Sequence, residues 1–394
     1  MKVVSLRFPG NFEDAFLYMG RLITITENHS VRIYDMKNIV SKLQEDENLL
    51  DAPKLLFLRN DLIDQEQFRN QLHNESGKAA FIKAVDKIES RSIQIDEDFL
   101  ESAEWDLNIK ADILLDLNIY NRRLYVGTNT GLYHLDLDWE SENTTPINKA
   151  QKRLEAKCIN TTAKFGTVNA SCGSEGLFSF LDDFDLGMNN TRKENHLPEY
   201  SLRTAWLNFD VVNYSTPIAT TLFKSLKTQF PREIIEPGKN FEEEIWIVTD
   251  LEESEFNFNS LFVNSSFRNR IDLKNIQFVY NSSKSLFLCT YDGSLFTLGL
   301  QSDNSSFPKI SYDRKYTGLG SSVSSIHTLG VKKAGIILET DEQVLLFTHG
   351  KFIPIFNSEV ISIRTFASSK HYKNIVSLTT SNEVVLIAIF DEEA

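Results

Sequence analysis

Short runs of apolar and β-branched residues recur along the chain, and each is followed by a polar turn and a second run of the same kind. The clearest pair lies at 124–127 and 132–135, on either side of Asn129-Thr-Gly131. Another lies within 284–298 and turns at Asp292-Gly293. An Asp-Gly pair between two apolar runs supplies the positive φ that a tight hairpin needs. Both segments are therefore predicted to be β-hairpins.

Four further segments follow the same order of strand, polar turn and strand. All six turns are centred near residues 29, 130, 175, 292, 342 and 382. Adjacent turns are about 45, 50 and 40 residues apart, which is the period of a four-stranded propeller blade. The two wider intervals have room for further strands and for inserted residues. In the second of them, 203–214 and 244–249 are predicted to be strands of a degenerate blade.

This period predicts an all-β chain that forms a single β-propeller over residues 1–394, with seven blades and six as the alternative. Seven blades of about 40–45 residues use about 300 residues, and two insertions, 41–105 and 222–243, account for the rest. The N-terminal run Val3–Phe8 is expected to complete the last blade, because it would otherwise leave an open edge. A pair of β-sandwiches is the alternative fold, but it does not explain a higher-order period of this length.

The segment Val31-Arg-Ile-Tyr-Asp35 resembles the strand end of a WD40 repeat, with Tyr in place of Trp. The whole chain resembles a divergent WD40-like or quinoprotein-like β-propeller. It departs from the WD40 pattern in lacking the Gly-His pair, and its Trp105-Asp106 does not end a repeat. The resemblance implies a rigid platform that binds other proteins. It carries over no catalytic residue, since these propellers share no common active site.

Residues 41–105 interrupt the β pattern with apolar residues at helical spacing, placed between the first two blades. Helices are predicted over 61–73 and 78–89. The segment contains eight Lys or Arg and fifteen Asp or Glu residues, a net charge of −7 out of −14 for the chain. One role for these acidic residues is to coat a solvated helical face. The other is to dock a partner protein with a basic surface, because attraction between unlike charges accelerates association. The second insertion, 222–243, contains two prolines and is predicted to be an ordered loop.

Four residues are candidates for partner binding. Trp105 and Trp139 flank the second blade in acidic surroundings, and Glu66 and Phe68 lie on the first predicted helix of the insertion. Tryptophan is enriched among binding hot spots. Core packing is the alternative role of both tryptophans.

The sequence contains no glycine-rich phosphate loop, nucleophile elbow or zinc-protease motif, so neither a catalytic residue nor a cofactor is predicted. Three cysteines without a CxxC pair fit a reducing compartment and buried apolar roles. Asp183, Asp185 and Glu194 have the spacing of a calcium loop, but its glycine is one position early and no helices flank it, so no metal site is predicted.

The termini and the charge set the expected location and partners. Arg7 and Pro9 interrupt the N-terminal apolar run, which is therefore too short for the apolar region of a signal peptide. No run reaches the ~20 apolar residues of a membrane helix. An intracellular, cytoplasmic protein is expected, with the nucleus not excluded and no membrane association. A net charge of −14 argues against direct nucleic-acid binding.

The predicted function is a non-catalytic scaffold or recognition subunit of a multiprotein complex, whose partner proteins present a basic surface to residues 41–105. The alternative is a ligand-sensing or enzymatic propeller with a small-molecule site in its central channel. Asp116, Asp210 and Asp292 are the carboxylates nearest to strand ends for such a site.

Overall fold

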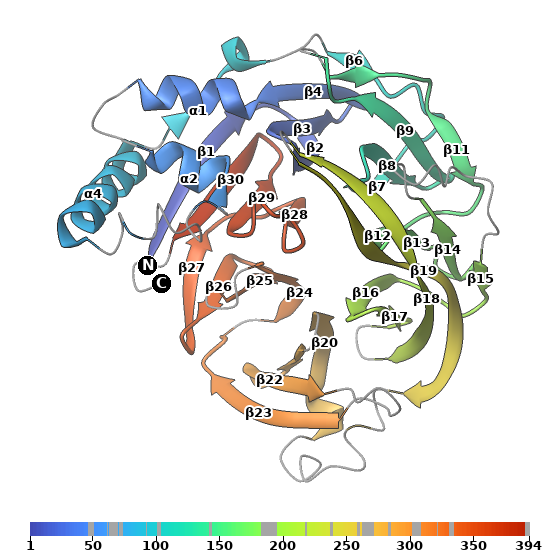
Figure 1. Cartoon of the computed structure of the whole chain (residues 1–394). Coiled ribbons are helices and arrows are strands. Elements are labelled where there is room, and N and C mark those ends of the chain that lie inside the picture. The colour runs from blue at the N-terminus through green and yellow to red at the C-terminus, as the bar shows by residue number, and fades with distance from the viewer. Residues whose placement is uncertain are drawn as a thin grey trace. The chain divides into compact units, whose positions relative to one another are not determined.

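The computed structural model describes residues 1–45, 51–60, 62, 70, 74–91, 93–100, 104–141, 144–182, 195–216, 219–236, 239–257, 261, 272–282, 285–301, 309–320, 322–330 and 335–390. Over these residues the chain forms seven sheets, whose strands pair antiparallel apart from one short parallel strand at the edge of the last blade (Figure 1). The fold is a seven-bladed β-propeller, as the turn spacing predicted. The six-bladed and β-sandwich alternatives are excluded.

The blades divide between two compact units, Met1–Asn108 with Asp138–Thr145 and Val323–Ala394, and Ile109–Leu137 with Pro146–Ser322. The first unit contains blades one, six and seven. Blade one consists of β2 (Phe12–Tyr18), β3 (Arg21–Thr26), β4 (Ser30–Asp35) and β6 (Trp105–Asp106), and blade six consists of β24 (Val323–Thr328), β25 (Ile336–Thr340), β26 (Val344–Thr348) and β27 (Lys351–Phe356). Blade seven consists of β28 (Ser362–Thr365), β29 (Ile375–Thr379), β30 (Glu383–Phe390), β1 (Lys2–Pro9) and β5 (Ile93–Gln94).

The second unit contains blades two to five. Blade two consists of β7 (Leu114–Tyr120), β8 (Arg123–Thr128), β9 (Leu132–Asp138), β10 (Thr145–Pro146) and β11 (Gln151–Leu154), and blade three consists of β12 (Asn160–Lys164), β13 (Thr167–Ser171), β14 (Leu177–Leu181) and β15 (Asn195–Leu197). Blade four consists of β16 (Arg203–Leu207), β17 (Asp210–Tyr214), β18 (Thr220–Glu236) and β19 (Lys239–Asn257), and blade five consists of β20 (Ile276–Ser282), β21 (Ser285–Thr290), β22 (Ser294–Gln301) and β23 (Lys309–Thr317). The seventh turn, which the sequence left as an inference, lies at 215–219, between β17 and β18.

A threonine closes the turn between the second and third strands in five blades. In blade five, the Thr290 hydroxyl accepts a hydrogen bond from the Ser294 amide at 3.1 Å and donates to the Ser294 carbonyl at 3.1 Å. Gly293 in this turn has φ 73°, which is the left-handed conformation expected of Asp-Gly. The other threonines that close a turn in this way are Thr26, Thr128, Thr340 and Thr380.

The two ends of the chain share blade seven. β1 pairs antiparallel with β30 from Lys2 opposite Phe390 to Pro9 opposite Glu383, which confirms the predicted role of the N-terminal strand. On its other side β1 pairs in parallel with β5, through Leu6 and Ile93. The short strand β5 therefore covers an edge that would otherwise be open to other chains.

The helical insertion joins the third strand of blade one, β4, to its short fourth strand, β6. It contains α1 (Met36–Gln44), α2 (Ala52–Phe57), α4 (Glu75–Arg91) and the 3-10 turn η2 (Glu97–Phe99); a second 3-10 turn, η4, spans Leu273–Asn275. The helix predicted at 78–89 is confirmed within α4, whereas the helix predicted at 61–73 falls outside the described residues except for positions 62 and 70. No helix in the described ranges is long and apolar enough to cross a membrane.

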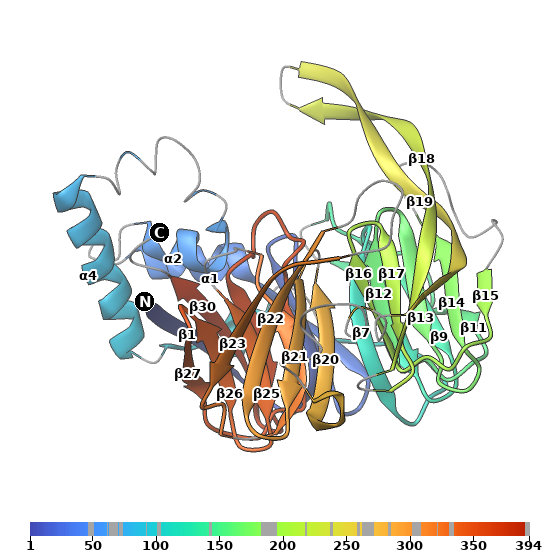
Figure 2. The same ribbon diagram turned by 90° about the horizontal axis from the view of Figure 1, so that it is seen from below.

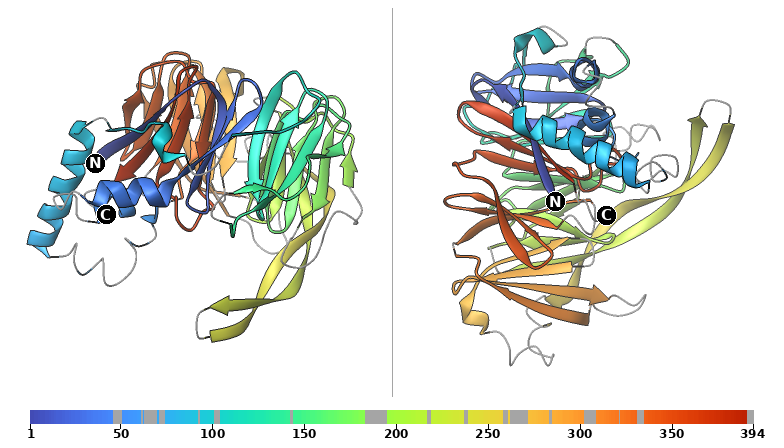
Figure 3. Two further views of the ribbon diagram at one scale, coloured as in Figure 1. Left: turned by 90° about the horizontal axis from the view of Figure 1, so that it is seen from above. Right: turned by 90° about the vertical axis from the view of Figure 1, so that its left-hand side faces the viewer.

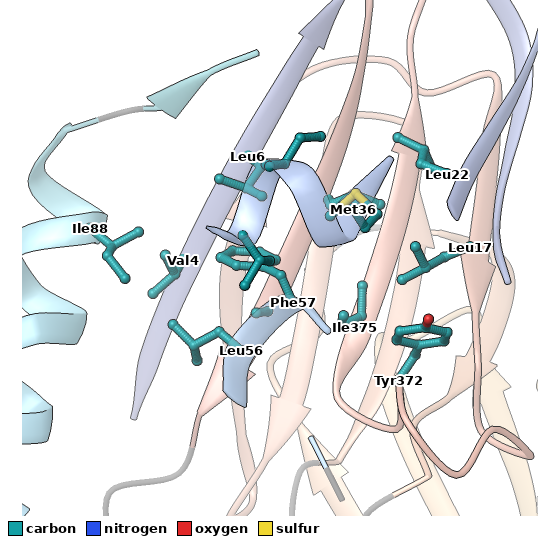
Figure 4. Close-up of a cluster of buried hydrophobic side chains, with 14 of the residues drawn as sticks. Val4, Leu6, Leu17, Leu22, Met36, Leu56, Phe57, Ile88, Tyr372 and Ile375 are labelled. Carbon is teal, nitrogen blue, oxygen red and sulfur yellow. The ribbon is translucent and has the colours of Figure 1, made fainter. Parts of the chain in front are cut away.

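The helices are fixed to the outer strands of blade seven by an apolar core. Phe57 of α2 and Ile88 of α4 are fully buried with Val4 and Leu6 of β1 (Figure 4), and α4 lies beside β1 (Figure 3). Asn60 follows α2 and is buried, and its amide nitrogen donates to the carbonyls of Leu55 and Leu56 at 2.9 and 2.8 Å. The insertion is therefore part of the folded core and not a separable appendage.

Residues 222–236 and 239–243 lie in the segment predicted to be a loop, but they belong to the strands β18 and β19, so the prediction of a loop was wrong. The two strands pair from Thr221 opposite Asn257 to Glu236 opposite Lys239, and their far ends extend beyond β16 and β17 (Figure 2). Pro231 is compatible with this pairing, because only β19 pairs with β18 beyond Phe223. We call β18 and β19 the ribbon.

Candidate functional site

The structure describes two of the four partner-binding candidates, and these two differ in burial. Trp105 is half-buried on β6, where it pairs with Val31. Trp139 is only 5% exposed, and its ring lies 4.8 Å from that of Tyr18, so it packs its segment against blade one. Glu66 and Phe68 lie outside the described residues.

An acidic edge lies beside blade one and consists of Asp96, Glu97, Asp98 and Glu104, all exposed. Arg32 on β4 donates to Glu104 at 2.9 Å and lies 3.5 Å from Glu97. The Asp96 carboxylate accepts from the Asp98 amide at 3.2 Å and so caps η2. Lys42 Nζ lies 4.2 Å from the ring centroid of Phe99 in η2 and is a second cation beside this edge. Four carboxylates against Arg32 and Lys42 leave the edge negative.

The exposed face of α4 is balanced by comparison. Its described acidic side chains are accompanied by equally many lysines: Glu75, Asp86 and Glu89 against Lys78, Lys83 and Lys87. Lys2 of β1 adds an ion pair with Asp86 at 2.7 Å. The sequence predicted a negative charge over the whole insertion. Within the described part of the insertion, the excess of acidic side chains is largest around η2.

A second surface lies at the base of the ribbon, in the other unit. Phe165 occupies the turn between β12 and β13 with φ 52°, and Phe209 occupies the turn between β16 and β17. Their ring centroids are 4.4 Å apart. The Phe209 ring is also 6.4 Å from that of Trp246 on β19, which is 40% exposed. We call Phe165, Phe209, Trp246 and the two lysines that lie over them the aromatic–lysine patch.

The lysines of the patch are Lys164 and Lys227. Lys164 Nζ lies 4.7 Å from the centroid of Phe165, and Lys227 Nζ lies 4.2 Å from Phe209 and 5.1 Å from Trp246. Burial lowers the pKa of Lys164. A cation over an aromatic face is attracted by the ring quadrupole, so these rings hold two ammonium groups in place.

Sequence analysis missed this patch because its aromatic residues come from three separate segments. One signal was available: Phe165 and Phe209 lie at turn tips, at Phe165-Gly166 and Asn208-Phe209, where blade packing does not require a large ring. The positive φ of Asn208, 56°, fits such a turn. Only the crossing of β19 over these turns brings Trp246 to them.

The carboxylates named for a channel site make local structural contacts. Asp116 on β7 accepts from both the amide and the hydroxyl of Thr161, at 2.5 and 2.7 Å, and so links blades two and three. Asp210 pairs with Lys224 at 2.8 Å. Asp292 accepts from Thr290 within its own turn, and this hydrogen bond lowers its pKa. Each carboxylate thus has a role in the fold.

No group of three or more His, Cys, Asp or Glu in the described ranges is arranged to hold a metal ion. The residues with calcium-loop spacing, Asp183, Asp185 and Glu194, lie outside those ranges. The three cysteines, Cys158, Cys172 and Cys289, are all buried as free thiols, in agreement with apolar roles.

One half-buried carboxyl differs from those above. Glu13 on β2 has an Oε2 atom that is buried and has no hydrogen-bond donor within reach among the described groups. The imidazole of His29 lies nearby, with its Nε2 3.8 Å from Glu13 Oε2. Burial, followed by repulsion from Glu27 and Asp14, raises the pKa of Glu13 to about 7.

No protein-family model and no curated protein matches the sequence. Solved structures match its fold. The β-propeller domain of Cps50 (Swd1) from Myceliophteria thermophila is 8% identical with a TM-score of 0.50, and the match covers 97% of each chain. The WD40 β-propeller domain of Doa1 is 10% identical with a TM-score of 0.49, covering 97% of this chain and 94% of that one. The N-terminal domain of Nup159 is 9% identical with a TM-score of 0.47, covering 94% and 87%. At these identities the likeness to Cps50 shows the fold alone, a divergent WD40-type β-propeller with seven blades.

Proposed function

We propose that this protein is a non-catalytic scaffold that binds other proteins as a recognition subunit of a multiprotein complex. The observation that carries the proposal is the way the helical insertion is built. Its apolar side chains are buried against β1 and β30, while the acidic edge remains exposed at a fixed position. A charged surface that is held rigidly costs little conformational entropy when a partner binds.

The partner that fits the acidic edge is a protein with a basic surface. Glu97 and Glu104 lie around Arg32, so only part of the negative charge is neutralised within the chain. Charge complementarity of this kind raises the association rate and selects among partners, and salt weakens it. The WD40-type fold of the chain is consistent with such a role.

Co-purification from the native host tests the proposal. Deleting 41–105 would be a poor test, because the deletion removes buried core residues such as Phe57 and Ile88. The suitable variant is Asp96→Asn, Glu97→Gln and Asp98→Asn, which keeps the shape of η2 and its cap. The matched control removes three exposed acids elsewhere, as Asp341→Asn, Glu342→Gln and Glu359→Gln.

The expected result is a defined set of proteins that co-purifies with the wild type and the control and is depleted about tenfold or more with the acidic-edge variant. Equal depletion by both variants would assign the effect to net charge and contradict docking at this edge. Absence of any co-purifying protein would overturn the scaffold function itself.

A further inference from the structure

The aromatic–lysine patch is held in place by hydrogen bonds from both sides. The Val248 amide donates to the Phe165 carbonyl at 3.0 Å, and the Thr167 hydroxyl donates to the Val248 carbonyl at 2.6 Å. These bonds tie β19 to the turn that carries Phe165. On the other strand, the Ser225 amide donates to the Asp210 carboxylate at 3.0 Å, next to Phe209. The patch is therefore preformed and needs no rearrangement to bind a ligand.

The patch has apolar area that the fold does not cover. Trp246 is 40% exposed. Phe165 and Phe209 are half-buried. Partly exposed aromatic side chains that are fixed by neighbouring rings are the usual anchors of a protein interface, because binding buries their area without ordering a flexible chain.

The charges of the patch are unbalanced. Lys164 and Lys227 make no ion pair with any carboxylate that the structure describes. Neighbouring lysines differ in this respect, since Lys224 pairs with Asp210 at 2.8 Å and Lys152 pairs with Glu155 at 2.5 Å. Two ammonium groups over apolar rings, in a chain of net charge −14, select for a ligand that brings negative charge and apolar surface together.

We propose that the aromatic–lysine patch binds an acidic segment of a partner protein, in which an aromatic or large aliphatic side chain is flanked by Asp or Glu. The apolar side chain packs on Trp246 and Phe209, and the flanking carboxylates pair with Lys227 and Lys164. This inference rests on the proposed scaffold function and adds to it a second surface with the opposite charge preference from the acidic edge.

Single-stranded nucleic acid is the other ligand class that combines stacking with positive charge. It is disfavoured here because phosphate binding gains its affinity from many cations along a groove. The patch offers only two lysines, too few to neutralise a nucleic-acid backbone along its length. A peptide with a few carboxylates is a better match than a chain with a charge on every nucleotide.

The test is selection of a displayed library of random peptides on the full-length wild-type protein, followed by anisotropy titrations of the enriched peptides with labelled probes. The variants are Trp246→Ala and the double variant Lys164→Glu and Lys227→Glu. Lys315→Glu is the matched control, because Lys315 is exposed and its Nζ also lies over a phenylalanine ring, 5.3 Å from the centroid of Phe296. A labelled dT oligonucleotide serves as the nucleic-acid probe, and circular dichroism verifies that each variant is folded.

Enriched peptides are expected to carry acids around an aromatic or aliphatic residue, with affinity reduced at least tenfold by Trp246→Ala and by the double lysine variant, and unchanged by Lys315→Glu. Peptides without acidic enrichment, or equal binding to the double variant, would overturn the proposal, as would a selection that enriches nothing. Binding of dT that is lost in the double variant would assign the patch to nucleic acid instead. If host proteins still co-purify with the double variant as with the wild type, the scaffold function stands and only this surface is rejected.

Discussion

Replacing Glu13 by glutamine should stabilise the protein at alkaline pH and leave its stability nearly unchanged in acid. The pKa of Glu13 is raised from 4.5 to about 7 because the carboxyl is partly buried and lies near Glu27 and Asp14. Between these two values, the folded chain retains a proton that the unfolded chain has released. Stability therefore falls as the pH rises through this window, and the full cost is present above about pH 7. Glutamine keeps the size of the side chain and removes the charge.

The magnitude follows from the same two pKa values. Their difference of about 2.5 corresponds to an upper limit of about 3.4 kcal/mol, at about 1.4 kcal/mol for each pKa unit. The Glu13 side chain is 29% exposed, so water screens part of the repulsion. The expected gain in the free energy of unfolding for Glu13→Gln is therefore about 1–2 kcal/mol above about pH 8, declining toward zero near about pH 4 to 5.

Urea unfolding of the wild type and the variant, followed by tryptophan fluorescence at about pH 5 and about pH 8.5, measures this difference. Glu342→Gln is the control, since Glu342 is exposed in the turn between β25 and β26. A gain for Glu13→Gln that is independent of pH, or a pH dependence equal to that of the control, would refute the assignment of the raised pKa to this site.

Three further outcomes are expected. Arg203→Lys should lower the free energy of unfolding in urea by about 1–2 kcal/mol. The reason is that the Arg203 guanidinium lies 4.4 Å from the ring centroid of Tyr214 and donates to the Val279 carbonyl at 2.6 Å. An equal effect of Arg314→Lys, at an exposed position, would contradict this expectation. Ile88→Ala should cost about 2–4 kcal/mol, since Ile88 is fully buried, and a cost no larger than that of the exposed Lys83→Ala would show that α4 is dispensable. The thiols should react slowly with Ellman's reagent in the folded protein and quickly in urea. Hydrogen bonding and burial raise the pKa of Cys158, and burial raises the pKa of Cys289 to about 12. Rapid reaction of the native protein would contradict this expectation.

The repeat was readable in the sequence because each blade repeats one local rule. A strand ends, a short turn follows, and the next strand begins, and all three are governed by residues close together in the chain. Asp292-Gly293 predicts its hairpin from two residues alone. Thr26 and Thr290 close equivalent turns by the same pair of hydrogen bonds, and a threonine at this position was visible in the sequence, although its role was not.

The candidate surfaces were less predictable, since each depends on residues that are distant in sequence. The strands within 222–243 were not predicted, because the segment contains two prolines. In the described residues beyond Phe223, β18 pairs only with β19, and such a strand tolerates a proline better than a central strand would. In the sequence, Trp105 and Trp139 look alike, because both are tryptophans with acidic neighbours. Their different burial is decided by what packs on them, such as the ring of Tyr18 on Trp139.

The sequence alone determined the propeller period, six of the seven turns and the strands beside them, because hydrogen-bonded hairpins and alternating apolar residues are local features. It favoured seven blades over six, and the structure established the seven sheets. The sequence also determined that the N-terminal strand needs a partner, since an unpaired edge exposes backbone groups. Only the tertiary structure decided that the helices of the insertion belong to the core, that the acids concentrate around η2, and that Trp246 meets Phe209 and Lys227. These are contacts between segments separated by tens to hundreds of residues, and the local pattern of a chain does not encode which of its surfaces will meet.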